Sequence, residues 1–92
     1  MDVYAQIVLN IIRHQEAIIG PVAVEQAEQI PNLHVEWDKQ LITIQGDPVQ
    51  AIDGLVKAYR HLFGQISVEV SKEAAASLLG QLQPAQLPQT LR

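Results

Sequence analysis

The sequence predicts a small α+β fold, a single domain in which two helix-Gly-helix pairs flank a β-hairpin. Two long segments, 3–19 and 48–63, have the apolar periodicity of amphipathic helices, and a glycine follows each of them. Two short segments between them, 33–37 and 41–45, alternate apolar and polar residues as strands do. A chain of 92 residues with 48% hydrophobic content is large enough for one packed core and too short for two.

The first helix pair is expected to bend at a glycine. Apolar residues in 3–19 recur every three or four positions and form one stripe. Gly20 ends this helix, because glycine readily adopts the left-handed conformation found after helix C-termini. Pro21 fits the first turn of a second, shorter helix at about 21–29.

A short β-hairpin is expected between the two helix pairs. Burial of its apolar face selects an even register, because a shift by one residue would turn apolar side chains to solvent. Lys39-Gln40 lacks the Gly or Asn of a tight two-residue turn. We therefore expect a four-residue loop from Asp38 to Leu41. The register that follows pairs Trp37 with Ile42 and Val35 with Ile44.

The clearest local signal opens the second helix pair. Asp47 is a favourable N-cap, and Pro48 suits the first helical position. We expect the helix to run from there to Gly64. On its outer face Asp53 and Lys57 stand four residues apart, and we expect them to form an ion pair.

Residues 66–82 fit two structures, because their apolar residues alternate like a strand and also recur every four positions like a helix. Sliding the chain along itself aligns Ile18-Ile19-Gly20 with Leu62-Phe63-Gly64. Both halves of the chain would then be helix, glycine, helix. This similarity predicts a helix over 66–80, with a strand as the alternative.

The chain divides into a domain of residues 1–82 and a Pro/Gln-rich C-terminal tail of residues 83–92. The tail carries periodic leucines. A segment of this composition is mobile when it is alone, so we expect order in it only where it packs against another surface.

Charge and composition exclude several classes of function. The net charge of −4 and the pI of about 5.1 oppose binding to a phosphate backbone, so no nucleic-acid partner is expected. No apolar run approaches the ~20 residues of a membrane span, and the N-terminus lacks the positive segment of a signal peptide. The absence of cysteine suits a reducing compartment. We therefore expect a cytoplasmic protein without a membrane partner.

No motif for catalysis or for cofactor binding is present in the sequence. His34 and Glu36 share the outer face of the hairpin, but a metal site there would need a distant third ligand such as His61. We expect no enzyme activity, no cofactor and no metal. The serines occupy ordinary helix-face positions: Ser67, Ser71 and Ser77.

The only basic cluster consists of Lys57, Arg60 and His61. Asp53 lies within one helical turn of it and cancels part of its field. The sequence therefore predicts no phosphate-binding patch here.

The segment from Ile18-Ile19-Gly20 to Phe63 resembles a K-homology RNA-binding module, in which an I-I-G-x-x-G turn precedes a helix, two strands and a long helix. The resemblance implies a degenerate nucleic-acid-binding or ligand-binding domain as the alternative function. The turn here is Gly20-Pro21-Val22-Ala23, which lacks both the second glycine and the basic residues that clamp a nucleic-acid backbone. With Ile19, it is also similar to an I-G-P-x-A stretch of helical tails in bacterial signalling proteins.

The apolar stripe of the first helix is wide for so small a protein, and a two-stranded hairpin is marginal alone with open edges. A second copy would cover both. We therefore expect a non-catalytic protein-protein interaction or assembly module that forms a homodimer. The alternative is that the helix residues form the core of the single chain. The predicted interface combines the first helix with one hairpin edge: Ile7, Val8, Ile11, Ile12, Leu41 and Thr43.

Overall fold

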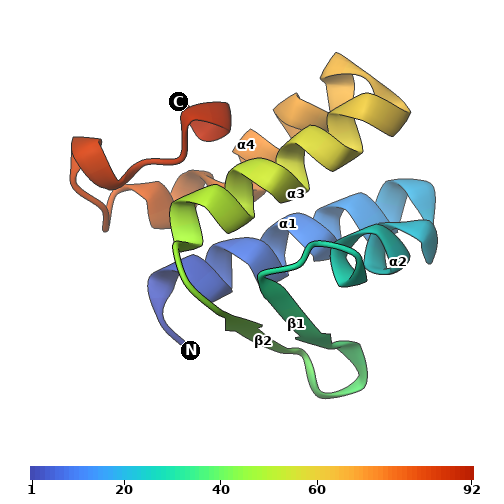
Figure 1. Ribbon diagram of the computed structural model, residues 1–92. Helices are drawn as coiled ribbons and strands as arrows, with labels where there is room; N and C mark the ends of the chain where they lie inside the picture. Colours follow the sequence, from blue (N-terminus) through green and yellow to red (C-terminus); the bar gives the residue numbers. More distant parts are fainter.

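Four helices and one β-hairpin make up the chain in the computed structural model, which describes residues 1–92 (Figure 1). This arrangement confirms the predicted α+β fold class. In chain order the elements are α1 (Val3–Ile19), α2 (Val22–Glu28), β1 (Leu33–Glu36), β2 (Leu41–Ile44), α3 (Pro48–Phe63) and α4 (Gln65–Leu79). Short 3₁₀ turns occupy Trp37–Lys39, Pro84–Gln86 and Gln89–Leu91.

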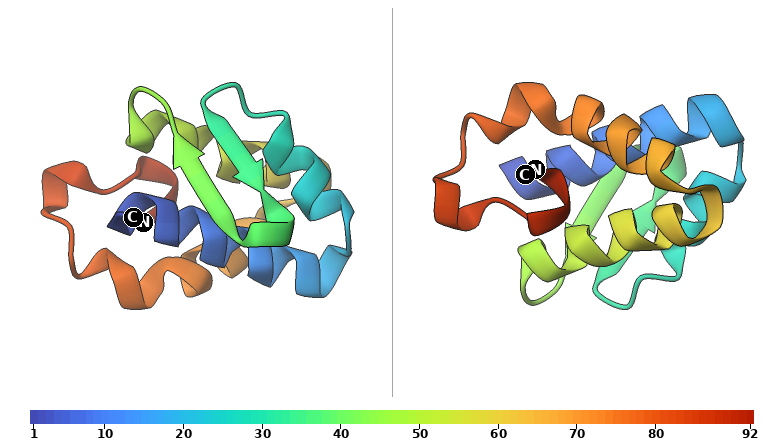
Figure 2. Two further views of the ribbon diagram at one scale, coloured as in Figure 1. Left: turned by 90° about the horizontal axis from the view of Figure 1, so that it is seen from below. Right: turned by 90° about the horizontal axis from the view of Figure 1, so that it is seen from above.

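Helix α1 lies at the centre of the fold. It contacts α2, α3, α4 and β2, so other parts of the chain surround it. The hairpin crosses the underside of the helices, as the left view of Figure 2 shows. None of the four helices has the length and the apolar character that spanning a bilayer requires.

Aspartate side chains cap the two long helices. Asp2 accepts a hydrogen bond from the backbone N–H of Ala5 at 2.9 Å, and Asp47 accepts one from that of Val49 at 2.9 Å. These bonds satisfy amide groups that the first turn of a helix leaves free. The start of α3 at Pro48 is therefore where the sequence predicts it.

Both helix pairs bend at a glycine with nearly the same backbone geometry. Gly20 has φ 77° and ψ −158°, and Gly64 has φ 81° and ψ −171°. Each donates its N–H to a carbonyl four residues earlier, Glu16 O at 2.9 Å and Arg60 O at 2.8 Å. The internal similarity thus correctly predicted a helix after Gly64, and the strand alternative is wrong.

The hairpin pairs in a different register from the predicted one. Val35 lies opposite Ile42, and the loop spans Trp37 to Gln40 instead of 38–41. The indole of Trp37 donates a hydrogen bond to Glu16 Oε2 at 3.1 Å, and Gln40 adopts a left-handed conformation and donates through Nε2 to Trp37 O at 2.7 Å. These contacts draw Trp37 out of the strand. The shift is by two residues, so the apolar face stays the same.

The C-terminal segment packs against the helices. Leu91 is 4% exposed, and Pro88 is fully buried. The phenol of Tyr4 in α1 donates a hydrogen bond to Gln86 O at 3.1 Å. The last 3₁₀ turn contacts both α3 and α4, which anchors the tail to the fold.

Candidate functional site

The predicted interface residues of α1 are core residues. Ile7, Val8, Ile11 and Ile12 are each 0% exposed within the single chain. A side chain without accessible surface cannot contact a second copy of the chain, so this part of the predicted interface is wrong. The alternative that the sequence left open is the correct one, because the elements around α1 cover its whole stripe.

The other two predicted interface residues lie on β2. Leu41 is 41% exposed and Thr43 is exposed, and both face away from buried Ile42. The structure therefore does not bring the six predicted residues together on one surface. Four of them lie inside the fold, and two lie on the outside of the hairpin.

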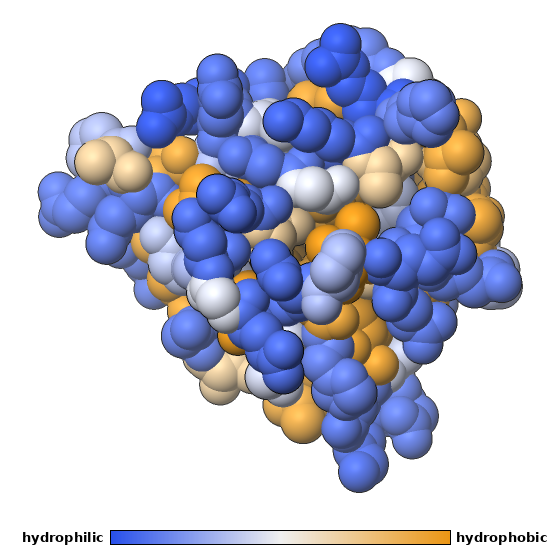
Figure 3. Space-filling view, in the orientation of Figure 1, coloured by the Kyte–Doolittle hydropathy of each residue, from blue (hydrophilic) through white to orange (hydrophobic).

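Apart from Met1 at the N-terminus and Leu41 in the hairpin, the large exposed apolar side chains lie at the two glycine bends. Ile18 is 65% exposed, Leu62 is 49% exposed and Ile66 is 72% exposed. Ile19 and Phe63 next to them are half-buried. We call these five residues the corner patch. Figure 3 shows hydrophobic residues along the right-hand edge of the molecule, where both bends lie in Figure 1.

Three buried hydrogen bonds, from the side chains of Gln15 and Tyr59, hold the bends at one end of the molecule. The side-chain amide of Gln15 donates to Ser67 O at 2.8 Å and to Ser71 Oγ at 3.1 Å, which joins the end of α1 to the start of α4. The phenol of Tyr59 in α3 donates to Ala23 O in α2 at 2.6 Å. All of these side chains are nearly or fully buried. Because such bonds are costly to break in a dry interior, they hold the corner patch together.

Tyr59 is the one ionisable side chain that the fold encloses completely, with 0% exposure. Burial disfavours the phenolate and raises the pKa of Tyr59 far above its ordinary value of 10.0. The phenol is therefore a permanent hydrogen-bond donor to Ala23 O under physiological conditions, and its role is structural.

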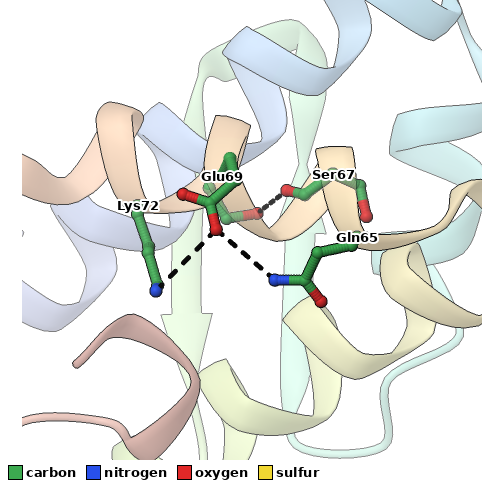
Figure 4. Close-up of polar contacts among 5 residues, drawn as sticks. Gln65, Ser67, Glu69 and Lys72 are labelled. Atoms are coloured by element: carbon green, nitrogen blue, oxygen red, sulfur yellow. Dashed lines mark hydrogen bonds and ion pairs between the residues drawn. The ribbon is translucent and has the colours of Figure 1, made fainter.

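A small polar cluster borders the corner patch on α4. In Figure 4 the side chains of Gln65 and Lys72 both reach Glu69, at 3.4 Å and 3.9 Å respectively. These are neighbours on one helix face, and pairs of this kind are exposed and weak. The hydroxyl of Ser67 donates to Gly64 O at 2.7 Å and stabilises the bend. The cluster therefore supports the bend and gathers no reactive groups.

A second surface feature lies on the outer face of α3. Lys57, Arg60 and His61 line a hollow of about 350 Å³. The predicted ion pair between Asp53 and Lys57 is absent, because Asp53 Oδ1 accepts hydrogen bonds from Thr90 N at 3.0 Å and Thr90 Oγ1 at 2.6 Å. Thr90 in the tail is thus the partner of the Asp53 carboxylate, in place of the predicted partner Lys57.

The hairpin pair His34 and Glu36 is exposed, with 3.4 Å between Nε2 and Oε1. No group of three or more His, Cys, Asp or Glu side chains is placed to hold a metal ion. Of the three serines, Ser67 and Ser71 are buried and their hydroxyls are hydrogen-bonded to backbone carbonyls. Neither serine is exposed to a substrate.

Sequence reasoning missed the corner patch, although a signal for it was present. Ile18-Ile19 and Leu62-Phe63 each place two adjacent apolar residues before a glycine. Adjacent residues on a helix point about 100° apart, so at the end of a helix one of the two faces outward unless another element covers it. The bend leaves no such cover for Ile18 and Leu62.

The turn on which the K-homology resemblance rests, Gly20-Pro21-Val22-Ala23, contains no cationic side chain. No protein-family model, curated protein or solved structure matches the chain.

Proposed function

We propose that this protein is a non-catalytic interaction module that self-associates through the corner patch. The observation that carries the proposal is the exposure of two isoleucines, Ile18 at 65% and Ile66 at 72%, on neighbouring bends. Exposure of large aliphatic side chains to water is unfavourable. Contact with another apolar surface removes this cost.

The size of the patch supports weak association. Burying an aliphatic side chain completely contributes roughly 1.5–3 kcal/mol, and Ile18, Leu62 and Ile66 are already partly covered. After the cost of association, this supports a dissociation constant on the order of 0.1–1 mM. Such an affinity fits reversible assembly better than a permanent dimer.

A second copy of the chain is the occupant that the patch favours. The two bends repeat the same motif, Ile18-Ile19-Gly20 and Leu62-Phe63-Gly64, with nearly the same backbone geometry. A twofold contact requires one surface that complements itself, and a repeated apolar motif without an ionised group in it meets this requirement.

Sedimentation velocity over a concentration series up to about 1 mM tests the proposal. We expect the wild type to show a reversible rise in weight-average mass, and the double substitution Ile18→Ser with Ile66→Ser to weaken association by about tenfold or more. Both positions are surface positions, so circular dichroism and thermal unfolding should show a folded variant.

Leu41→Ser is the matched control, because it removes an exposed aliphatic side chain from the hairpin instead of the bends. We expect it to associate like the wild type. A wild type that stays monomeric throughout the series contradicts self-association. A loss of association in Leu41→Ser but not in the double variant would place the interface on β2.

A further inference from the structure

Two shallow, adjoining hollows lie on the outer face of α3, and the docked tail borders one of them. Lys57, Arg60 and His61 line one of about 350 Å³. Lys57, Arg60, Gln89 and Thr90 line the other of about 310 Å³. No hydrophobic residue lines either of them. We call these five residues the basic hollow. Its volumes are at the lower end of the range for small-molecule clefts.

The cations of the basic hollow have no carboxylate partner. The chain's ion pairs use Lys39, Lys72 and His34, and the carboxylates of Glu36 and Glu69. Lys57 and Arg60 are therefore free, although the chain as a whole carries a net charge of −4. Positive side chains that form no ion pair attract anions locally even on an acidic protein.

The tail binds the carboxylate that would otherwise pair with Lys57. Asp53 lies one helical turn before Lys57 and would pair with it on an isolated helix. In the fold, Thr90 donates two hydrogen bonds to Asp53 Oδ1, at 3.0 Å from its N and 2.6 Å from its Oγ1. The same tail segment brings Thr90 and Gln89 to the edge of the hollow. Docking of the tail thus both leaves Lys57 without its neighbouring carboxylate partner and forms one side of the second hollow.

The donors gathered here match a phosphate-type oxyanion. A guanidinium group offers several N–H donors in one plane, and an ammonium group offers a compact charge. The side-chain amide of Gln89 adds neutral donors. A tetrahedral oxyanion has several acceptor oxygens and can accept hydrogen bonds from several of these groups at once. A halide ion has no separate acceptor oxygens.

We propose that the basic hollow binds a phosphate-type oxyanion, and that the docked tail completes this site. The bound group is inorganic phosphate or the phosphate of a small monoester. The site lies on α3 and the tail and shares no residue with the corner patch.

The test is a titration of the ¹⁵N-labelled full chain with inorganic phosphate in low-salt buffer, because salt screens exposed charges. We expect saturable shifts of the amide signals of Lys57, Arg60, His61 and Thr90, and no such shifts with chloride at equal ionic strength. Phenyl phosphate is the second arm. Tighter binding of phenyl phosphate identifies a monoester site, and tighter binding of phosphate identifies a site for the free ion.

Substitutions separate a specific site from general charge. We expect Lys57→Gln and Arg60→Gln each to weaken phosphate binding by about fivefold or more. Lys39→Gln removes the same charge from the hairpin and should leave the affinity unchanged. Equal weakening by Lys39→Gln and Lys57→Gln would overturn the proposal, as would the absence of saturable shifts.

Two further variants test the part played by the tail. Asp53→Asn keeps an acceptor oxygen for Thr90 but removes a negative charge near the hollow, so we expect phosphate to bind several-fold more tightly. Thr90→Val removes the hydroxyl that holds Asp53, and we expect weaker binding. An affinity unchanged by Thr90→Val would contradict completion of the site by the tail.

Discussion

Tyr59 shows how a single residue joins distant parts of this chain. It comes from α3, its side chain is fully buried, and its phenol bonds to a backbone carbonyl of α2 at 2.6 Å. Gln15 has the same role between α1 and α4. Both are polar groups whose hydrogen bonds are satisfied in the interior, which makes their contacts specific as well as stabilising.

The raised pKa of Tyr59 predicts a stability that depends on pH in the alkaline range. The folded chain holds the phenol proton more tightly than the unfolded chain, whose phenol has the ordinary pKa of 10.0. The stabilisation is therefore complete below that value and declines as the pH rises above it, by up to about 1.4 kcal/mol per pH unit.

Urea unfolding at several pH values between about 8 and 11 measures this effect. Tyr59→Phe should be about 1–2 kcal/mol less stable near neutral pH, because Ala23 O loses a buried partner. The variant also lacks the alkaline decline in stability that Tyr59 causes. The difference in the free energy of unfolding between the two proteins should therefore shrink above pH 10. A difference in unfolding free energy that stays constant with pH would contradict the claim that the buried Tyr59 phenol causes the alkaline decline.

Each bend between two helices depends on the backbone of its glycine. At φ 81° and ψ −171°, Gly64 has a conformation that is essentially restricted to glycine. A Cβ at this position would meet no atom within 4 Å, so any cost of a substitution comes from the backbone alone. Gly80 has helical angles and equally open surroundings.

The two glycines form a matched pair for mutagenesis. We expect Gly64→Ala to lower the free energy of unfolding by about 1–3 kcal/mol. Gly80→Ala should leave it unchanged or raise it by up to about 1 kcal/mol, because alanine restricts the unfolded chain. Thermal or urea unfolding of both variants gives the answer. Equal effects of the two substitutions would mean that the bend tolerates other backbone conformations.

Most elements were predictable because their signals are local. Asp47-Pro48 predicts the start of α3, and the glycines predict where α1 and α3 end. The hairpin register was not predictable, since it depends on a hydrogen bond from Trp37 to Glu16, which lies 21 residues earlier in the chain. Contacts of that kind leave no trace in local periodicity.

At the scale of the whole molecule, the C-terminal tail is anchored to the helices. Leu91 is 4% exposed, and Thr90 is bonded to Asp53 in α3. Both chain ends lie on the left of Figure 1, away from the glycine bends. The proposed interaction surface and the tail thus occupy opposite ends of the molecule.

Leu91→Ala should release the tail. We expect it to lower the free energy of unfolding by about 2 kcal/mol and to speed hydrogen exchange at the Thr90 amide, which donates to Asp53. Gln81→Ala, at an exposed position before the tail, is the control and should change neither quantity. Unchanged exchange at Thr90 in Leu91→Ala would show that the tail is held without its leucine.

The sequence by itself determined which side chains share a face of each helix, where the helices begin and end, and that the chain folds as helix pairs around a hairpin. Only the tertiary structure decided that the α1 stripe of Ile7, Val8, Ile11 and Ile12 is core, while Ile18 and Ile66 are exposed. Periodicity shows that a face is apolar. It does not show whether the same chain or another one covers that face, because the covering residues lie far away in the sequence.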